Sequence, residues 1–427
     1  MSTSTPVRGS ARSARAARTR TGIVEAANRL FVEHGYRSTS LRDIAAAAGL
    51  SLPGLQRHFA TKDALLAAVV DSFLLSSETL LLEQTPAGEA GAIDFGLIAR
   101  NNAEIPGYMP LYAALNGEAS TANHPAHELL RARYARLISM STEGIDDAIR
   151  HDVVSSDRDP RAEAIRVIAG WDGLQLLAQY LPDSIDVVGM VESRQEMLSY
   201  PVGWTDAEDS RARQDDPAPI PSRPRFLDDI PLVVGYRVGR ERRTRIIEDA
   251  TALFGREGYA DTSLSDIARA VGVSKSTLLH HYPSKEELLG AVLIERDRSI
   301  LSRVANVKAE SAADELRGIP SAAAEDAVSA PGLIQVHAVL SCEAVPADHP
   351  AHAYFVERFR EEIEYFVALM RAAQHDGDLP SHRDPEAEGI WLAALWEGLQ
   401  YQWLYDADSV NVATQLAAHL EDVLPRE

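Results

Sequence analysis

The chain contains one sequence written twice, and this duplication constrains its fold more than any other feature. Residues 23–66 match residues 246–289 without a gap at an offset of 223, with 21 identities in 44 positions. At an offset of 225, His124-Pro-Ala-His127 recurs as His349-Pro-Ala-His352, and Trp171-Asp-Gly-Leu-Gln175 recurs as Trp396-Glu-Gly-Leu-Gln400. Because an internal repeat decides the architecture, we expect two similar units in one chain.

The two units are separated by a segment rich in proline. Six prolines lie between residues 199 and 232, and proline removes a backbone donor and fixes φ, so this segment is expected to be a linker. A chain of 427 residues is also longer than one hydrophobic core usually organises. The expected divisions are a basic, unstructured arm (1–20), a first helix-turn-helix domain (21–68), a first helical regulatory domain (69–198), the linker (199–234), a second helix-turn-helix domain (235–291) and a second helical regulatory domain (292–427).

Each unit has the periodicity of helices. Apolar residues recur at i, i+4, i+7 and i+8, as in Ile23, Ala27, Leu30 and Phe31, and no long alternating strand pattern is present. We therefore predict an all-α fold.

The ends of the early helices carry clear signals in both units. Gly35 suits a left-handed helix end, and Ser40 with Asp43 forms a capping-box pattern for the helix that follows. The second unit repeats these residues as Gly258, Ser263 and Asp266.

The next residues have the spacing of a helix-turn-helix. Ala45 permits close helix approach, Gly49 permits positive φ in the turn, and Leu55 supplies a buried anchor for the second helix. The equivalent residues of the second unit are Ala268, Gly272 and Leu278, each at the same offset. Two copies in register indicate a DNA-binding motif far more strongly than one.

The chain resembles the tetracycline-repressor (TetR) family of bacterial transcription regulators. The resemblance rests on both helix-turn-helix segments and is closest in the second, from Gly258-Tyr-Ala-Asp-Thr-Ser through Val273-Ser-Lys-Ser-Thr-Leu278 to Lys285. It implies C-terminal helices that bind a small-molecule effector and dimerise. Since such regulators are usually homodimers of one unit, it also implies that this chain supplies both halves of a dimer.

The expected DNA contacts differ between the two units. The second recognition helix presents Lys275, Ser276 and Thr277 in its first turn, where side chains meet base edges in the major groove. The first presents Leu52, Pro53 and Gly54 instead, which suit a thymine methyl or close backbone approach. The other candidates for base or phosphate contact are Arg42, Ser51, Gln56, Arg57, His58, Lys62, Ser263, Ser265, Ser274, Leu279, His280, His281 and Lys285.

These residues also have plainer interpretations. Exposed Arg and Gln are ordinary on helix surfaces, Ser274 can simply cap a helix, and His58 and His281 can be packing residues. Leu279 stands where the resemblance implies a phosphate-contacting tyrosine, which removes one donor. The unequal recognition helices predict a pseudo-palindromic operator with unequal half-sites.

Charge is distributed in the way a DNA-binding protein of this kind requires. The whole chain carries −21, but residues 8–62 carry +7 and residues 235–285 carry +3, so the remaining residues carry −31. Local basic charge favours oriented docking on DNA over indiscriminate adhesion, and binding should weaken with salt.

The single cysteine, Cys342, allows no internal disulfide and no thiolate cluster, which fits a cytoplasmic protein. No long apolar segment suggests a membrane span. The two His-Pro-Ala-His stretches each place two histidines at i and i+3, which is a pattern that can bind a metal. No cysteine or carboxylate set of zinc-like spacing accompanies them. No metal or cofactor is expected.

The regulatory domains offer candidates for an effector pocket and for contact between the units. A pocket is implied by the resemblance, with Phe95, Tyr108, Met109 and Tyr112 in the first unit and His337, Cys342, Trp391 and Tyr401 in the second as candidate lining; the alternative is that each is a core residue. Trp171, Gly173, Trp396 and Gly398 are expected at the interface, since glycine inside a helix allows close packing.

The residues favour a sequence-specific regulator, most simply an effector-responsive repressor, over two alternatives. An enzyme is disfavoured because no P-loop, dinucleotide fingerprint, nucleophile elbow or HExxH segment is present. A helical ligand- or protein-binding scaffold that has lost DNA binding would leave both basic segments without a role. The expected partners are duplex DNA and a small molecule. The chain is expected to act as an intramolecular pseudo-dimer, and a further homodimer would carry four modules.

Overall fold

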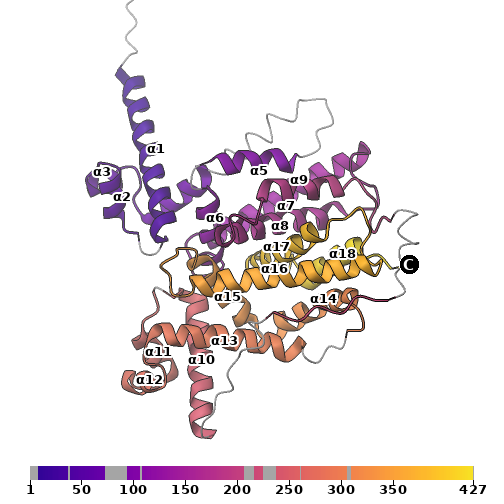
Figure 1. Cartoon of the computed structure of the whole chain (residues 1–427). Coiled ribbons are helices and arrows are strands. Elements are labelled where there is room, and N and C mark those ends of the chain that lie inside the picture. Colours follow the sequence, from indigo (N-terminus) through magenta and orange to yellow (C-terminus); the bar gives the residue numbers. More distant parts are fainter. Residues whose placement is uncertain are drawn as a thin grey trace, which may run out of the picture.

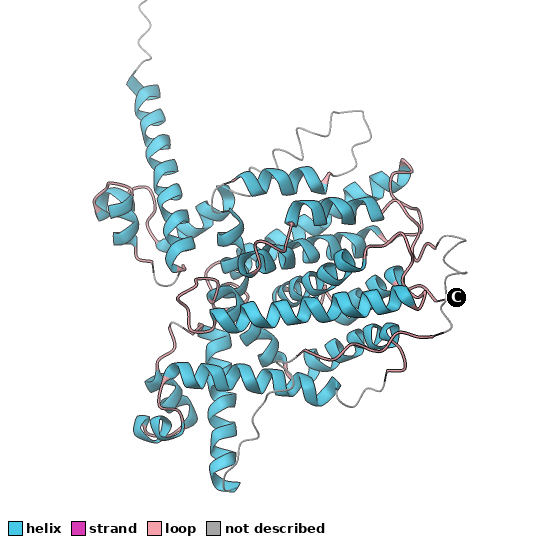
Figure 2. Ribbon diagram, in the orientation of Figure 1, coloured by secondary structure: helices cyan, strands magenta, loops and turns pink. Residues whose placement is uncertain are grey.

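The computed structural model describes residues 8–36, 39–72, 94–105, 108–205, 216–224, 237–259, 261–304 and 309–426. The side chains of residues 8–14, 108, 237–241 and 300–304 are not described. Within these ranges the chain forms helices joined by loops and no strand, which confirms the all-α prediction (Figure 2).

The two repeats contain corresponding helices (Figure 1). The first repeat comprises α1 (Arg8–His34), α2 (Leu41–Ala47), α3 (Leu52–Gln56), a helical segment over residues 62–72, α5 (Phe95–Glu104), α6 (Tyr108–Glu118), α7 (His127–Arg150), α8 (Pro160–Tyr180) and α9 (Val187–Met197). The second comprises α10 (Arg237–Glu257), α11 (Leu264–Val271), α12 (Lys275–His281), α13 (Lys285–Val304), α14 (Ala312–Ser329), α15 (Pro331–Glu343), α16 (His352–His375), α17 (Pro385–Tyr405) and α18 (Val412–Val423).

The basic N-terminal segment is helical where the structure describes it. The prediction of an unstructured arm is wrong for residues 8–20, because α1 begins at Arg8 and continues without a break to His34. Alanine and arginine are among the best helix formers, so these residues extend the amphipathic helix that follows them. Residues 1–7 lie outside the described part.

The repeats pack against each other mainly through α8 and α17, and two glycines set their separation. A Cβ at Gly173 would lie 1.8 Å from the Ala394 carbonyl oxygen, and a Cβ at Gly398 would lie 1.8 Å from that of Ala169. The contact is reciprocal because the four residues are equivalent in pairs at an offset of 225. Only glycine allows two helix backbones to approach this closely.

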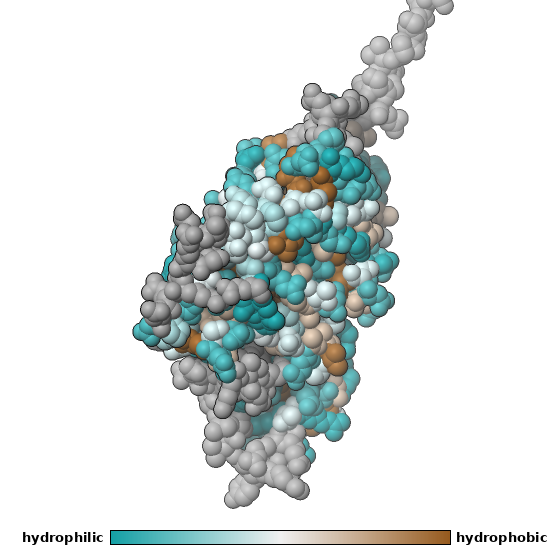
Figure 3. Space-filling view, turned by 90° about the vertical axis from the view of Figure 1, so that its right-hand side faces the viewer, coloured by the Kyte–Doolittle hydropathy of each residue, from teal (hydrophilic) through white to brown (hydrophobic). Residues whose placement is uncertain are grey.

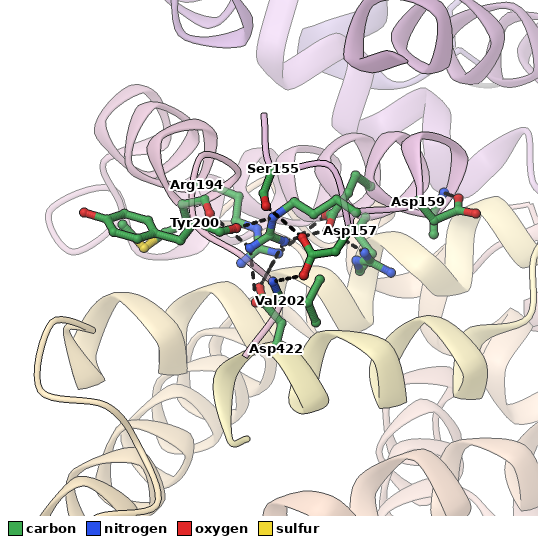
Figure 4. Close-up of polar contacts among 12 residues, drawn as sticks. Ser155, Asp157, Asp159, Arg194, Tyr200, Val202 and Asp422 are labelled. Carbon is green, nitrogen blue, oxygen red and sulfur yellow. Dashed lines mark hydrogen bonds and ion pairs between the residues drawn. The ribbon is translucent and has the colours of Figure 1, made fainter. Parts of the chain in front are cut away.

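A buried ion cluster lies beside this contact (Figure 4). Asp422 of α18 contacts Arg158 (3.1 Å), Arg383 (3.2 Å) and Arg194 (3.5 Å), and it accepts a hydrogen bond from the Gly203 amide (3.1 Å). Residues from both repeats and from the start of the linker therefore share one carboxylate.

The described part of the linker follows the second repeat. The Ala218 amide donates to Asp376 (2.7 Å), and the Arg223 guanidinium lies 3.3 Å from Glu315. These contacts place residues 216–224 along α14 and the end of α16.

Both helix-turn-helix segments lie on one side of the helical body, with α1 and α10 pointing in opposite directions (Figure 1). The face on the other side is mainly hydrophilic, and its apolar residues form separate patches (Figure 3). Among the described helices, none is long and apolar enough to span a membrane.

Candidate DNA-binding surface

The second helix-turn-helix is built by two capped helices and one left-handed glycine. Ser263 and Asp266 form a reciprocal capping box at the start of α11, which ends at Gly272 with φ of 75°. Ser274 then caps α12 by accepting a hydrogen bond from the Thr277 amide (3.1 Å). The predicted caps and turn are therefore present.

The first helix-turn-helix follows the same plan with a shorter recognition helix. Ser40 and Asp43 form its capping box, and Gly49 has φ of 69°. Ser51 caps α3, which contains only five residues, with Pro53 in its first turn. Proline is tolerated there because the first amides of a helix have no helical partner.

Buried residues at the predicted spacing hold each pair of helices together. Ala45 and Leu55 are 2% and 0% exposed, and Ala268 and Leu278 are 3% and 0% exposed. Their burial leaves the opposite face of each recognition helix to solvent.

The residues predicted to contact DNA through the two recognition helices and the helices before them are exposed or half-buried. The exposed residues are Arg42, Ser51, Pro53, Gln56, Arg57, Ser263, Ser265, Ser274, Lys275, Ser276 and His280, and the half-buried ones are Leu52, Gly54, His58, Thr277, Leu279 and His281. Ser263 and Ser274 also serve as helix caps. The two recognition helices thus present different side chains from equivalent positions.

Lys62 and Lys285, both predicted to contact phosphate, make contacts within their own chain. The Lys62 ammonium donates to the Tyr36 and Thr39 carbonyl oxygens (2.9 and 3.0 Å) and lies 4.3 Å from the Tyr36 ring centre. Lys285 lies 4.2 Å from the Tyr259 ring centre, and burial lowers its pKa. Both cations face their own chain, so we assign them to the fold of each module.

Two arginines of the basic segments that precede the helix-turn-helix motifs lie against the recognition helices. Arg20 donates to the His58 carbonyl oxygen (3.2 Å) and lies 4.1 Å from the Phe59 ring centre. Arg243, its equivalent, lies close enough to His281 that burial and then this guanidinium lower the pKa of His281. The two arginines occupy equivalent positions at the offset of 223.

The His-Pro-Ala-His stretches join each helix-turn-helix to its regulatory domain. His127 and His352 each contact a carbonyl oxygen at the end of the preceding helix (2.9 Å), while His124 and His349 pack edge-on against Tyr36 and Tyr259. Glu343 also accepts a hydrogen bond from the Tyr259 amide (2.6 Å). These histidines therefore have structural contacts at the junction of the two domains.

Among the described side chains, the residues predicted to line an effector pocket do not share one cavity, although Cys342 and Tyr401 contact each other. Tyr112 bonds to Arg133, His337 to Glu397 (2.9 Å) and Cys342 to Tyr401 (3.2 Å), all within the core. Phe95 lies at a cleft between α7 and α9, Met109 packs on the core, and the side chain of Tyr108 lies outside the described part.

Two tryptophans of α17 have exchanged their predicted roles. Trp391, predicted in the pocket, packs against Gly170 of the other repeat, where a Cβ would lie 2.4 Å from its ring. Trp396, predicted at the interface, lines a cavity in its own repeat. Five residues along a helix turn a side chain by about 140°, to nearly the opposite face. Trp171, which is the equivalent of Trp396 in the first repeat, is half-buried and packs on the core.

That cavity has a volume of about 210 Å³ and lies among α14, α15, α16 and α17 of the second repeat. A second, open cleft of about 540 Å³ lies between the ends of α1 and α10, and Cys342 is among its lining residues. The first cavity adjoins the linker at Arg223 and Pro224. The second adjoins the ends of α1 and α10, which belong to the two DNA-binding modules.

Two exposed recognition helices on a helical body define a DNA-binding regulator of the helix-turn-helix class, and comparison with known proteins identifies its family. A family model described as bacterial regulatory proteins, tetR family, matches residues 23–69 and again residues 246–292. The transcriptional regulatory protein RaaS of Mycobacterium tuberculosis is 31% identical over 169 residues, covering 39% of this chain and 74% of that protein. The chain belongs to the tetR family.

Other relatives also match less than half of this chain but most of their own length. The transcriptional repressor KstR2 of Rhodococcus jostii is 28% identical over 191 residues, which cover 43% of this chain and 89% of that protein. A tetR-family regulator of known structure from Agrobacterium tumefaciens is 20% identical, with a TM-score of 0.39, and covers 44% of this chain and 99% of its own. Regulators of this family are not enzymes; they bind DNA operators and small-molecule effectors.

Proposed function

We propose that this regulator is a repressor in which one chain occupies one operator through both helix-turn-helix modules. The observation that carries the proposal is the reciprocal packing of α8 and α17, in which Gly173 and Gly398 make equivalent contacts. Such a contact is typical of a two-fold interface between subunits, and here both partners belong to one chain. For simultaneous binding, the modules must present their recognition helices to major-groove faces about 34–36 Å apart, or a multiple of this.

The operator in this proposal has unequal half-sites. Lys275, Ser276 and Thr277 are donors that suit guanine acceptors and phosphates, whereas Leu52 and Pro53 suit a thymine methyl. Arg57 and Gln56 supply the polar contacts of the first half-site. The basic segments before each module add a contribution that depends on salt and not on sequence.

An effector acts in this proposal by favouring a spacing of the modules that no longer fits successive major grooves. Since a ligand can shift an equilibrium only by its difference in affinity for two states, it must bind the released arrangement more tightly. The cavity in the second repeat is our candidate for its site.

Selection from a randomised duplex library at two salt concentrations tests the proposal. We expect enrichment of a site with two dissimilar arms, and weaker retention at higher salt. Enrichment of two identical arms would refute the unequal half-sites. No enrichment at either salt, with and without cell extract as a source of effector, would favour a scaffold that has lost DNA binding.

A further inference from the structure

The cavity of the second repeat has an apolar wall and a charged floor. Ile319, Leu333, Phe366, Leu369 and Trp396 supply the wall, and Arg296, Arg358, Glu362 and Glu397 supply the floor. A volume of 210 Å³ corresponds to about seven waters of liquid, which suits a ligand of about eight non-hydrogen atoms. Apolar pockets with a few convergent polar groups are typical binding sites for small molecules.

Arg296 is the floor residue with donors to spare. Its side chain is 8% exposed, and within the described residues its ion pair with the neighbouring Asp297 is long, at 3.5 Å. Asp297 is shared, because it also accepts a hydrogen bond from Tyr354 (2.7 Å) and lies 3.7 Å from Arg358. Burial and then the Arg358 guanidinium lower the pKa of Arg296. An anion placed here would stabilise this cation.

The carboxyl groups of the floor are already engaged. Glu362 accepts a hydrogen bond from Arg358 (2.8 Å), and Glu397 lies 2.9 Å from the ring nitrogen of His337. Burial raises the pKa of both carboxyl groups. Glu315, Glu325 and Asp326 line the cavity as well, and its cations are Arg223, Arg296 and Arg358.

The linker between the repeats forms part of the same cavity. Arg223 and Pro224 line it, and Arg223 is held against Glu315, which also accepts a hydrogen bond from Tyr365 (2.9 Å). The linker, a segment that exists only because two units are joined, thus adds Arg223 to the cations that line the cavity.

The first repeat fills the equivalent positions with larger or uncharged side chains. Ala323 and Ala327 correspond to Ile98 and Asn102, Glu362 corresponds to Leu137, and Arg296 corresponds to Phe73. Phe73 lies outside the described part. Arg133, which is the equivalent of Arg358 in the first repeat, is stacked on Tyr112 (4.2 Å), and Tyr134 donates to Asp172 (2.6 Å).

We propose that the second repeat alone binds a small apolar carboxylate, with Arg296 receiving the carboxylate and the linker closing the site. This inference rests on the proposed effector response and names the chemical class and stoichiometry of the effector. A carboxylate can accept two parallel hydrogen bonds from one guanidinium, and such charge-assisted bonds are about twice as strong as neutral ones.

Three probes that share one apolar tail test the head group. Hexanoate, 1-hexanol and hexylammonium are titrated separately into the full chain without DNA, and binding is followed by calorimetry. We expect one hexanoate per chain, with hexanol binding on the order of ten- to a hundredfold more weakly. Tighter binding of hexylammonium would overturn the proposal, as would two equivalents of hexanoate or no hexanoate binding.

Variants locate the site. Arg296→Gln should remove the preference for hexanoate over hexanol. Arg298→Gln should keep it, because Arg298 is a half-buried arginine of the same helix that is not among the residues lining the cavity. Ala323→Ile, which copies the first repeat, should weaken both probes together. An unchanged hexanoate affinity in Arg296→Gln would refute the assignment even if Ala323→Ile fails to fold. Because these titrations contain no DNA, their failure is distinct from a failure of operator selection.

Discussion

Replacement of Asp422 by asparagine should strongly destabilise the contact between the repeats. The carboxylate is buried, with 3% of the side chain exposed, and it contacts Arg158, Arg383 and Arg194 at 3.1, 3.2 and 3.5 Å. Asparagine keeps the shape but removes the charge that these guanidinium groups share. Glu163 and Glu388 still pair with two of them (2.7 and 2.6 Å). Since breaking a buried ion pair costs about 3–5 kcal/mol, we expect the lower end, about 3 kcal/mol.

The assay is equilibrium unfolding in urea at pH 7, with the free energy and the slope m fitted together. The exposed Asp183→Asn is the matched control and should change stability by no more than about 0.5 kcal/mol. Loss of the ion cluster should lower the stability of the contact and can separate the unfolding of the two repeats into two transitions. A loss below about 1 kcal/mol in Asp422→Asn would refute the reasoning.

The pH dependence of the free energy of unfolding tests independently whether the charge of Asp422 is stabilising. Burial alone raises the pKa of Asp422, but the guanidinium groups of Arg194, Arg383 and Arg158 outweigh it, so the pKa lies well below its ordinary value. A depressed folded pKa means that the stabilisation is present above the unfolded pKa of about 3.9 and is lost as pH falls below it. The difference between wild type and Asp422→Asn should therefore shrink below about pH 4.

Three further substitutions test the interface and the modules. Gly173→Ala should destabilise the chain by about 3 kcal/mol in urea unfolding, because its Cβ meets the backbone of the other repeat, whereas Gly290→Ala, with open space around it, should be neutral or stabilising. Lys275→Ala should weaken operator binding by about 1–3 kcal/mol and relax base preference in one half-site only; an equal loss on every sequence would contradict direct readout. Lys62→Ala should lower the free energy of unfolding by about 1–3 kcal/mol, because the contacts of Lys62 with two carbonyl oxygens are lost. The salt dependence of DNA binding should not change; a weaker salt dependence would show that Lys62 contacts phosphate.

The local signals of the helix-turn-helix could be predicted from the sequence because they act over three or four residues. The capping boxes at Ser40 and Ser263, the positive φ of Gly49 and Gly272, and the buried Leu55 and Leu278 depend on short-range geometry, and the duplication provided each signal twice. A signal that occurs twice in register is stronger than one that occurs once.

The assignment of faces in the regulatory helices could not be predicted in the same way. α17 is buried on nearly every side, so its pattern does not indicate whether Trp391 or Trp396 meets the other repeat. The ion cluster was missed because Asp422 has no equivalent in the first repeat, where Met197 stands at the matching position. The cavity could not be predicted because small residues such as Ala323 line it, and an alanine in a helical sequence gives no sign of a neighbouring cavity.

The mass of the complex with a selected operator tests the central claim most directly. The chain has a mass of 46.5 kDa, and the complex can be weighed by native mass spectrometry or by analytical ultracentrifugation at increasing protein concentration. We expect one chain to bind a duplex that carries both arms. Binding should be abolished when the spacing of the arms is changed by half a helical turn. Two chains on the minimal two-armed duplex, each using one module, would contradict it.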